Sequence, residues 1–266
     1  MVVVRQQRRF RSHRSVYRFL WCMLIILGTS SSGWPYHVHQ ASNARRLHLW
    51  HDTSEIFTDM WKGAQAAFSL STVAYLLPTA AVIGGASFAD DTLQAAFRGN
   101  DEDDPLARAG NIYGLLYFGP VQAGLYLTGI LTDAPRLVDT SKRAMAALLG
   151  TQLLIQPLKY LTRRRTPDGT SRLSFPSGHA GAISSLIPAL YTEYGVLPAT
   201  LATLSAGFIG FTRLYGNAHH LSDVLTGYAI GFGWGLLVEL AHRRSWALLP
   251  LSEGQATVGL AFYMRL

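Results

Sequence analysis

Six uncharged stretches fill most of the chain between residues 64 and 238. None of them alternates apolar and polar residues with the period of two that a half-buried strand shows, and alanine, leucine and glycine dominate their composition. We therefore expect an all-α fold built as a bundle of six helices. The expected helices cover Ala64–Phe88, Ile112–Thr132, Ala144–Leu158, Ala180–Thr192, Tyr194–Thr212 and Val224–Val238.

The lengths of these stretches bear on whether the chain enters a membrane. The first, second and fifth reach the roughly 17–25 residues that cross a bilayer, and the other three are shorter. Charged residues make up 15% of the chain, against about 25% in a typical soluble domain. We expect a membrane-embedded bundle, with the buried helical core of a secreted protein as the alternative.

The amino-terminal residues are typical of an export signal. Six arginines lie between residues 5 and 18, well before the first acidic residue, Asp52, and supply most of the formal net charge of +7. An apolar run from Phe19 to Gly28 follows them, and then small residues up to Gly33. This order predicts a signal peptide or an N-terminal anchor over residues 1–33. Because the basic residues gather there and not along a groove with aromatic side chains, we expect no nucleic-acid partner.

Composition divides the rest of the chain into three parts. Residues 34–63 mix tryptophan and tyrosine with polar side chains and are expected to form an interfacial linker. Residues 64–243 hold the helical domain. Residues 244–266 are a C-terminal extension whose end is rich in strand formers, which favours a strand, with simple docking on the domain as the alternative.

Three polar clusters interrupt the apolar stretches, and all three fall at helix ends. They are Lys159–Gly169 after the third stretch, Pro176–His179 before the fourth, and Thr212–Asp223 between the fifth and the sixth. If successive helices run antiparallel, these ends share one face of the bundle. We therefore expect catalytic loops to cluster on that face.

The side chains that would meet there are mostly cationic. They are Lys159, Arg213 and the three arginines at 163–165, together with the imidazoles of His179 and His219. Such a set suits a tetrahedral anion, above all phosphate. We expect no metal and no other cofactor, because cations of the protein would take that role.

The segment Pro176–His179 is well suited to the start of a helix that faces an anion. Proline fits the first turn of a helix, and Ser177 supplies a hydroxyl. Gly178 lets the backbone approach the anion closely, where the unpaired N–H groups of a helix start point toward it. His179 then stands within reach of a leaving-group oxygen.

His219 and Asp223 are four residues apart, so they lie on one face if the sixth helix starts near His219. A carboxylate that accepts a hydrogen bond from one ring nitrogen leaves the other nitrogen free to attack. His219 is therefore a candidate nucleophile, with Asp223 as its orienting partner.

These clusters resemble the three motifs of the type 2 phosphatidic acid phosphatase (PAP2) superfamily, which also includes the vanadium haloperoxidases. The motifs are K-x6-R-P, P-S-G-H and S-R-x5-H-x3-D. The second is complete, and the third departs only at Thr212, where serine is usual. The first has Lys159 but places Thr166 where the family has arginine. Either Arg165 or Arg163 is expected to supply the missing cation.

The resemblance implies a phosphatase that hydrolyses a phosphate monoester or diphosphate of a membrane lipid. His219 would attack phosphorus and form a phosphohistidine while Asp223 orients it, and His179 would protonate the leaving oxygen and then activate water. The implied phosphate-binding residues are Lys159, Arg165, Ser177, Gly178 and Arg213.

Two other functions stay open at this point. The neutral Thr166 allows a catalytically impaired membrane protein that binds phosphate without turnover. A vanadate-dependent haloperoxidase is a further alternative, although those relatives are typically large and soluble. In bacteria the family usually faces the periplasm, so we expect a membrane location with an extracytoplasmic catalytic face.

Overall fold

The computed structural model describes residues 49–67, 70–97, 100–243, 246–253 and 257–264. The expected signal peptide or anchor lies outside the described residues, as does the first half of the expected linker, residues 34–48.

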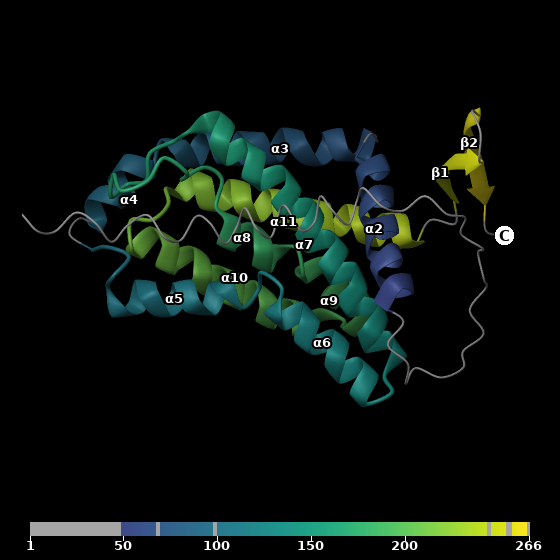
Figure 1. Cartoon of the computed structure of the whole chain (residues 1–266). Helices are drawn as coiled ribbons and strands as arrows, with labels where there is room; N and C mark the ends of the chain where they lie inside the picture. Colours follow the sequence, from purple (N-terminus) through teal and green to yellow (C-terminus); the bar gives the residue numbers. More distant parts are fainter. Residues whose placement is uncertain (1–48, 68–69, 98–99, 244–245, 254–256, 265–266) are drawn as a thin grey trace, which may run out of the picture. The chain divides into compact units, whose positions relative to one another are not determined.

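Ten helices make up the domain in the described part of the chain (Figure 1). The predicted all-α class is confirmed for this domain. The helices are α2 (Leu49–Ala66), α3 (Leu70–Ser87), α4 (Asp90–Ala96), α5 (Pro105–Leu115), α6 (Pro120–Leu131), α7 (Pro135–Thr162), α8 (Gly178–Ser184), α9 (Ile187–Tyr194), α10 (Val196–Tyr215) and α11 (Leu221–Arg243).

Three of the six expected helices are each divided in two. The first stretch is shared between α2 and α3, the second between α5 and α6, and the fourth between α8 and α9. Gly119 has a positive φ of 132° just before Pro120 opens α6, and the α5–α6 pair is bent by 45°. Pro188 stands in the first turn of α9. Proline has no N–H to donate to the preceding turn, so it starts a new helix more readily than it continues one.

Helix α7 is longer than its uncharged stretch because charged residues extend it at the N-terminal end. It begins at Pro135 and ends where Arg163 adopts a left-handed conformation with a φ of 45°. The left-handed residue turns the chain out of the helix, as at many helix C-termini. Lys159 is therefore in the last turn of α7, at the mouth of the following loop.

Helix α8 is enclosed by its neighbours and packs closely against α11. Its contacts with α7, α10 and α11 bury nearly every residue of the helix. Glycines four residues apart line the side of α11 that meets it, so the two backbones can approach without side chains between them. The glycines are Gly227, Gly231 and Gly235, and a Cβ atom at each would meet the carbonyl oxygen of Ser177, Gly181 or Ser185 in turn.

Helix α2 belongs to this domain, although residues 49–63 were expected in a linker. It packs against α7 and α11, and Ile56 and Met60 contact the cluster that contains the buried Val238. The reason is the apolar face of α2, which the mixed composition of this segment concealed.

A buried ion cluster joins α7, α9 and α11. The Arg143 Nε donates to Glu239 Oε1 at 2.9 Å, and its Nη2 donates to Glu193 Oε2 at 3.2 Å. The other oxygen of Glu239 accepts from the Thr192 hydroxyl at 2.7 Å. Arg143 also pairs with Asp139, one turn earlier on α7. Both Arg143 and Glu239 are buried, so these pairs satisfy charges that water does not reach.

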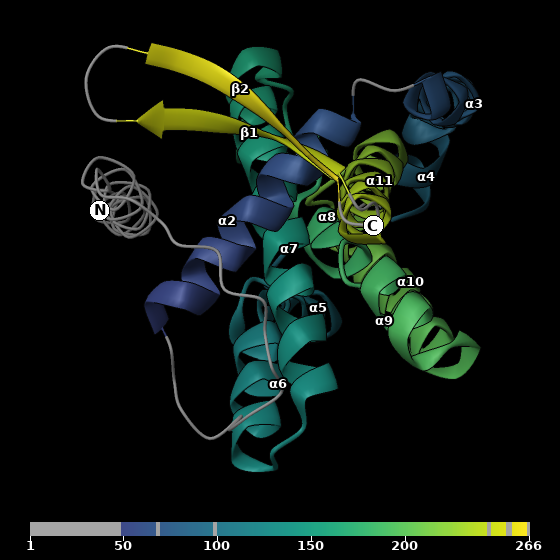
Figure 2. The ribbon, with the colours of Figure 1, turned by 90° about the vertical axis from the view of Figure 1, so that its right-hand side faces the viewer.

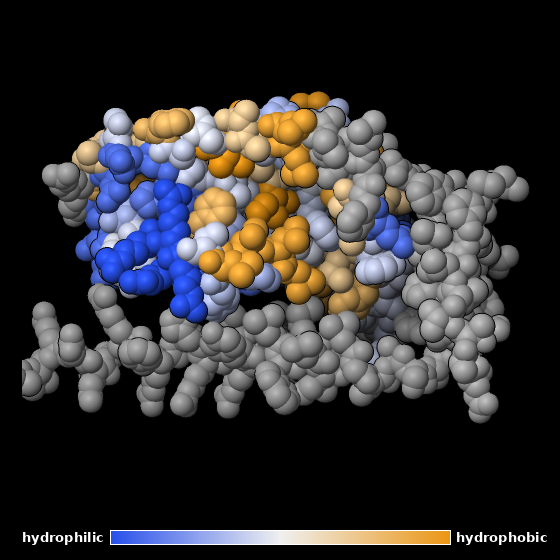
Figure 3. Space-filling view, turned by 90° about the horizontal axis from the view of Figure 1, so that it is seen from above, coloured by the Kyte–Doolittle hydropathy of each residue, from blue (hydrophilic) through white to orange (hydrophobic). Residues whose placement is uncertain are grey.

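The outer surface of the helical domain carries many apolar side chains. Figure 3 shows hydrophilic residues gathered at one end of the domain and hydrophobic ones over its middle. Among the described helices, α11 alone is by itself long and apolar enough to cross a membrane, and the bent pair α5–α6 would be a second span if it counts as one. Of the three stretches that the sequence marked as long enough, the second has a counterpart among these spans, as the bent pair α5–α6, while α11 forms over the shorter sixth stretch. The fifth stretch forms a single long helix, α10, whose apolar content falls short of the same criterion.

Two strands follow the helices. Strand β1 (Trp246–Glu253) pairs with β2 (Thr257–Met264) in a two-stranded sheet, and the two run in opposite directions (Figure 2). They occupy the extension for which the sequence favours a strand.

Candidate active site

Main-chain hydrogen bonds tie together the three polar clusters. The N–H of Ser177 donates to the carbonyl oxygen of Asp223 at 2.9 Å, which links the start of α8 to the start of α11. The loop after α7 joins them, because Ser174 N–H donates to Arg164 at 3.1 Å and Asp168 N–H donates to Asn217 at 3.2 Å. The three loops thus form one connected surface at one end of the bundle.

His219 and Asp223 lie together, though not on one helix. Helix α11 begins at Leu221, so Asp223 is in its first turn while His219 belongs to the preceding loop. The His219 N–H donates to the carbonyl of Arg213 at 3.1 Å. Its Nδ1 stands 3.8 Å from Asp223 Oδ2, which is longer than a hydrogen bond. The carboxylate therefore faces the ring without a direct bond in this state.

Two other donors already occupy that carboxylate oxygen. Asp223 Oδ2 accepts from the His220 N–H at 2.8 Å and from the Ser174 hydroxyl. Asp223 is fully buried. These contacts fix the carboxylate plane before any charge develops on His219, so its orientation does not depend on the histidine.

His179 is held in an aromatic and apolar setting. Its ring meets Phe118 edge-on with centroids 5.1 Å apart, and it lies against Gly114 of α5. Burial lowers the pKa of His179 to about 3, and the positive charges of Arg213 and Lys159 act in the same direction. The His179 Nε2 has no hydrogen-bond partner in the described part of the chain.

Burial and the positive charges of Lys159 and Arg213 act on both imidazoles. Burial lowers the pKa of His219 to about 4, with Asp223 opposing the shift and with Lys159 and Arg213 adding to it. The positive charge of a protonated His219 would also lower the pKa of His179. The two rings and the two cations are thus close enough to interact electrostatically, and both rings are neutral at pH 7.

Arg213 presents unpaired donors inside the protein. Its side chain is 2% exposed, and Nη1 donates to Asn111 Oδ1 at 2.8 Å. Its Nε and Nη2 are buried with no acceptor among the described residues. Buried guanidinium donors without partners are costly, and an oxyanion between them would satisfy two at once. Asn111 orients the guanidinium group of Arg213, and no sequence pattern marked Asn111 as a site residue.

Lys159 is the second cation at the site. Its ammonium group donates to the carbonyl of Leu173 at 2.6 Å, and burial lowers the pKa of Lys159 to about 8. A Cβ atom at Gly178 would stand 3.9 Å from the Lys159 Cε and 3.4 Å from the Phe118 ring. The backbone at Gly178 is therefore next to the lysine. Ser177 is buried as the N-cap of α8, where its hydroxyl accepts from the Ala180 N–H at 3.5 Å.

The arginines after α7 are divided between different tasks. Arg163 and Arg165 are exposed, and for Arg165 the structure shows a contact of its main-chain carbonyl, with the His220 ring at 3.3 Å. The structure therefore does not bring the Arg165 side chain into the buried group of Lys159 and Arg213. Arg164 turns inward instead, where it bonds Asp223. The order of three adjacent arginines could not reveal which of them would do so.

Thr166, at the position where an arginine was expected, stabilises its own loop. Its hydroxyl pairs with Asp168, and it accepts the Ser171 N–H at 3.1 Å. The Thr166 N–H donates to the Ser171 carbonyl at 3.0 Å. The residue closes a short loop and contributes no charge to the site.

Residues 142–247 match the family model described as the PAP2 superfamily. The match includes both imidazoles, Asp223, Lys159 and Arg213. This part of the chain, less than half of its length, is thus similar to the PAP2 superfamily.

Two curated relatives match parts of this chain. A lipid A 1-phosphatase of Porphyromonas gingivalis is 35% identical over 129 residues, which cover 46% of this chain and 28% of that protein. A lipid A 1-phosphatase of Rhizobium etli is 34% identical over 82 residues, covering 30% of this chain and 34% of that protein. The chain thus spans about a third or less of the length of these relatives.

One solved structure is similar in outline. A transmembrane PAP2-type phosphatidylglycerolphosphate phosphatase from Bacillus subtilis is 20% identical, with a TM-score of 0.45, over 71% of this chain and 94% of that one.

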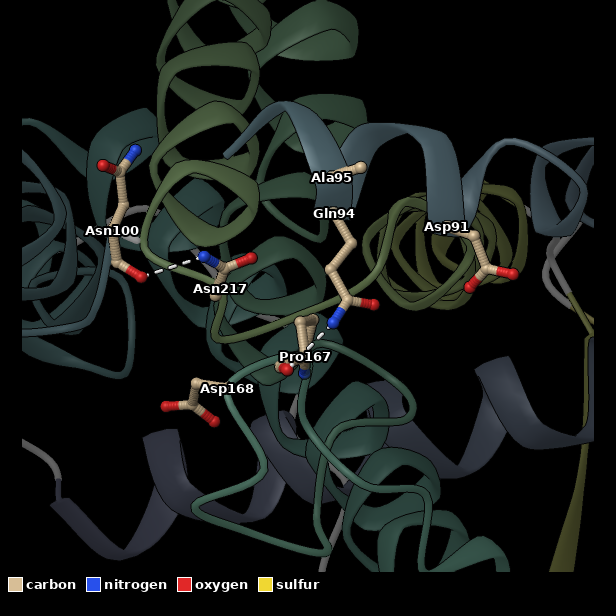
Figure 4. Close-up of a pocket in the computed structure, with 7 residues that line it drawn as sticks. All are labelled: Asp91, Gln94, Ala95, Asn100, Pro167, Asp168 and Asn217. Atoms are coloured by element: carbon tan, nitrogen blue, oxygen red, sulfur yellow. Dashed lines mark hydrogen bonds between the residues drawn. The ribbon is translucent and has the colours of Figure 1, made fainter. Parts of the chain in front are cut away.

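A polar pocket opens beside the loops of the candidate site. It has a volume of about 390 Å³, and amide and carboxylate side chains line it, among them Gln94, Asp168 and Asn217 (Figure 4). A much smaller cavity shares Gln94, Pro167 and Asn217 with it and reaches His219. The pocket lies between α4 and the loops, and α4 had no expected role in the site.

One group of potential metal ligands occurs in the described residues, and it is on α2. Ligand atoms of His51, Asp52 and Glu55 lie within 4.8 Å of one another. The Lys142 ammonium already bonds Glu55, and it lies 3.4 Å from Asp52. The lysine supplies the positive charge that these carboxylates require.

Proposed function

We propose that this chain is a phosphatase that removes a phosphate group from a lipid phosphomonoester or diphosphate by way of a phosphohistidine. The observation that carries the proposal is the pair of buried, unpaired donors of Arg213 beside two neutral imidazoles. Cationic donors fixed before the reaction stabilise the charge that develops on transferring phosphoryl oxygens.

In the proposed first step, the Nε2 of His219 attacks phosphorus while Nδ1 faces Asp223. The bond from phosphorus to the leaving oxygen breaks, and His179 gives that oxygen its proton. In the second step His179 takes a proton from water, the water oxygen attacks phosphorus, and the bond to His219 breaks. Lys159 and Arg213 neutralise the phosphoryl oxygens throughout.

The low pKa of His179 fits this scheme once substrate is considered. In the free protein its ring is neutral because of burial and the nearby positive charges. A bound phosphate dianion offsets those charges and favours the protonated ring. His179 thus becomes protonated when substrate binds and can act as the general acid. It is a neutral base again once the leaving group has taken its proton.

The names of the relatives support a lipid substrate. Two of them are lipid A 1-phosphatases, and the similar solved structure is a phosphatidylglycerolphosphate phosphatase. The apolar surface and α11 support a membrane location for this chain as well. We place the catalytic face outside the cytoplasm.

The side of the membrane is open to a labelling test. Glu102 lies in an exposed loop whose neighbour Asp104 accepts from Tyr215 at 3.3 Å, near the catalytic loops. A Glu102→Cys variant on a Cys22→Ser background should react with a membrane-impermeant maleimide in intact cells. Labelling that appears only after lysis would place the site in the cytoplasm.

The activity itself is tested with full-length protein in detergent, by phosphate release from phosphatidic acid, a polyprenyl diphosphate and lipid A, with EDTA present. We expect release from at least one of them, at least a thousandfold slower in His219→Gln. His220→Gln is the matched control, because the His220 main chain rather than its ring contacts Asp223. Equal rates in wild type and His219→Gln would end the proposal.

A second proposal follows from the place of Thr166. Because that side chain is used inside its own loop, the site has one fewer cation than the family pattern implies. The chain would then bind phosphate with little or no turnover. Protection of the fold by orthovanadate, without phosphate release from any of the three lipids, would favour this reading.

A further inference from the structure

Asp90, at the start of α4, is buried among groups of the catalytic loops. Its Oδ2 accepts from Arg164 Nη2 at 2.8 Å and from the Ser222 hydroxyl at 2.6 Å, and its Oδ1 accepts from the Ser222 N–H at 2.9 Å. Burial opposes ionisation, yet the hydrogen bonds from Ser222 and Arg164 outweigh it and lower the pKa of Asp90. The side chain is thus a carboxylate, 4% exposed and fully paired.

Arg164 connects this carboxylate to the candidate catalytic one. Its Nη1 donates to Asp223 Oδ1 at 2.6 Å and to the Ser222 hydroxyl at 2.7 Å, while Nη2 holds Asp90. A planar guanidinium can hold two carboxylates in fixed directions, which a lysine ammonium cannot do. With Oδ1 of Asp223 held this way, Oδ2 is the oxygen that faces His219.

Helix α4 is itself fixed to both loops, so Asp90 does not move independently. The Gln94 side-chain amide donates to the carbonyl of Pro167 at 3.0 Å, in the loop after α7. The Asn217 amide, in the loop before α11, donates to the carbonyls of Phe97 at 2.8 Å and Asn100 at 2.9 Å. The end of α4 and the residues after it are therefore hydrogen-bonded both to the loop after α7 and to the loop before α11.

Charge explains why a second carboxylate is needed. Without Asp90, the positive charge of Arg164 would be balanced by Asp223 alone. Arg164 and a positively charged His219 ring would then compete for that one carboxylate. Asp90 balances Arg164, so the trio of Asp90, Arg164 and Asp223 retains one net negative charge. That charge remains available when His219 becomes positive.

We propose that Asp90 is a positioning residue for the reaction: through Arg164 it holds Asp223 in place and leaves the Asp223 charge free to stabilise a positive His219. This inference rests on the proposed function, in which His219 is the nucleophile.

The test is Asp90→Asn in the full-length protein, which keeps the shape of the side chain and removes its charge. We expect kcat to fall roughly tenfold, as for other residues that act through a catalytic partner, with KM within about twofold. Asp91→Asn is the matched control, since Asp91 is the next residue on α4 and is exposed. Arg164→Lys should also lower kcat with the fold retained, which covers the case in which Asp90→Asn does not fold.

A second measurement does not depend on turnover. The nitrogen shifts of ¹⁵N-labelled histidines, with His219 assigned from the His219→Gln protein, report its titration. Removing the charge of Asp90 makes the surroundings of His219 more positive, so we expect it to titrate at lower pH than in wild type. Lys159, Arg213, His179 and Asp223 also face this ring and are unchanged by the substitution.

The outcomes separate the two proposals. A folded Asp90→Asn protein with wild-type kcat and an unmoved His219 titration would overturn the positioning role. Wild-type protein that releases no phosphate would instead count against the proposed function, and the His219 titration would still decide whether Asp90 acts on the histidine.

Discussion

Gly114 and His179 are in such close contact that a Cβ atom on the glycine would stand 2.5 Å from the His179 Cδ2. The glycine belongs to α5 and the histidine to α8, and the α5 backbone forms one wall of the imidazole site. No spacing rule links residues 114 and 179.

Gly114→Ala should therefore displace the imidazole and lower kcat at least tenfold, an order-of-magnitude expectation for a misplaced catalytic group. Gly124→Ala is the control, because nothing lies within 4 Å of a Cβ at that helical position. Each of the two substitutions also favours the helix, by up to about 1 kcal/mol, because alanine has a higher helix propensity than glycine. A Gly114→Ala enzyme as active as wild type would show that the ring has room to move.

Arg213→Lys should weaken anion binding while keeping the positive charge. The lysine cannot replace the Nε and Nη2 donors that are unpaired in the buried pocket. Loss of one charged hydrogen bond of about 1.5–3 kcal/mol corresponds to a roughly ten- to hundredfold weaker inhibition by orthovanadate. Arg172→Lys, at an exposed position, is the control, and an inhibition constant unchanged in Arg213→Lys would contradict the clamp.

Acidification should destabilise the fold partly through His179 and His219. Both have a pKa below the ordinary value of about 6.5, so the unfolded chain binds protons that the folded chain does not. Stability is then present above about pH 6.5 and decreases as the pH falls toward 4, by up to about 1.4 kcal/mol per pH unit for each ring.

This dependence is measured by thermal unfolding in detergent between pH 4 and 7. The His179→Gln, His219→Gln double variant should show a flatter curve over that interval than wild type, because the carboxylates of both proteins titrate alike. Parallel curves for the two proteins would mean that folding does not lower the pKa of either ring.

The ion cluster around Arg143 should contribute more to stability than the exposed ion pair next to it. Glu239→Gln leaves a buried guanidinium short of one charge, which costs roughly 3 kcal/mol in the free energy of unfolding. Arg136→Gln breaks a pair with Glu193 in which the Arg136 side chain is 74% exposed, and should cost clearly less, because water screens an exposed pair. Chemical denaturation of the two variants checks this order, and equal losses would contradict it.

The helical class and the chemistry available to the loops could both be predicted from the order of the amino acids. Long uncharged stretches rich in alanine and leucine and without period-two alternation favour helices, and the spacing of His179, Arg213, His219 and Asp223 carried the family resemblance that the PAP2 match confirms. Helix ends were located to within about one turn where a polar cluster stopped an apolar run, since α7 ends at Thr162 and the expected helix at Leu158. They were missed where proline or glycine broke a run from within, as at Gly119.

Tertiary structure decided which side chains actually meet. Three adjacent arginines are equivalent in the sequence, yet the left-handed turn at Arg163 sends Arg164 toward Asp223 and leaves Arg165 exposed. Asp90 and Asn111 reach the site from helices more than fifty residues away along the chain. Local patterns cannot encode such contacts, because they depend on how whole helices pack and on which buried charge has no other partner available.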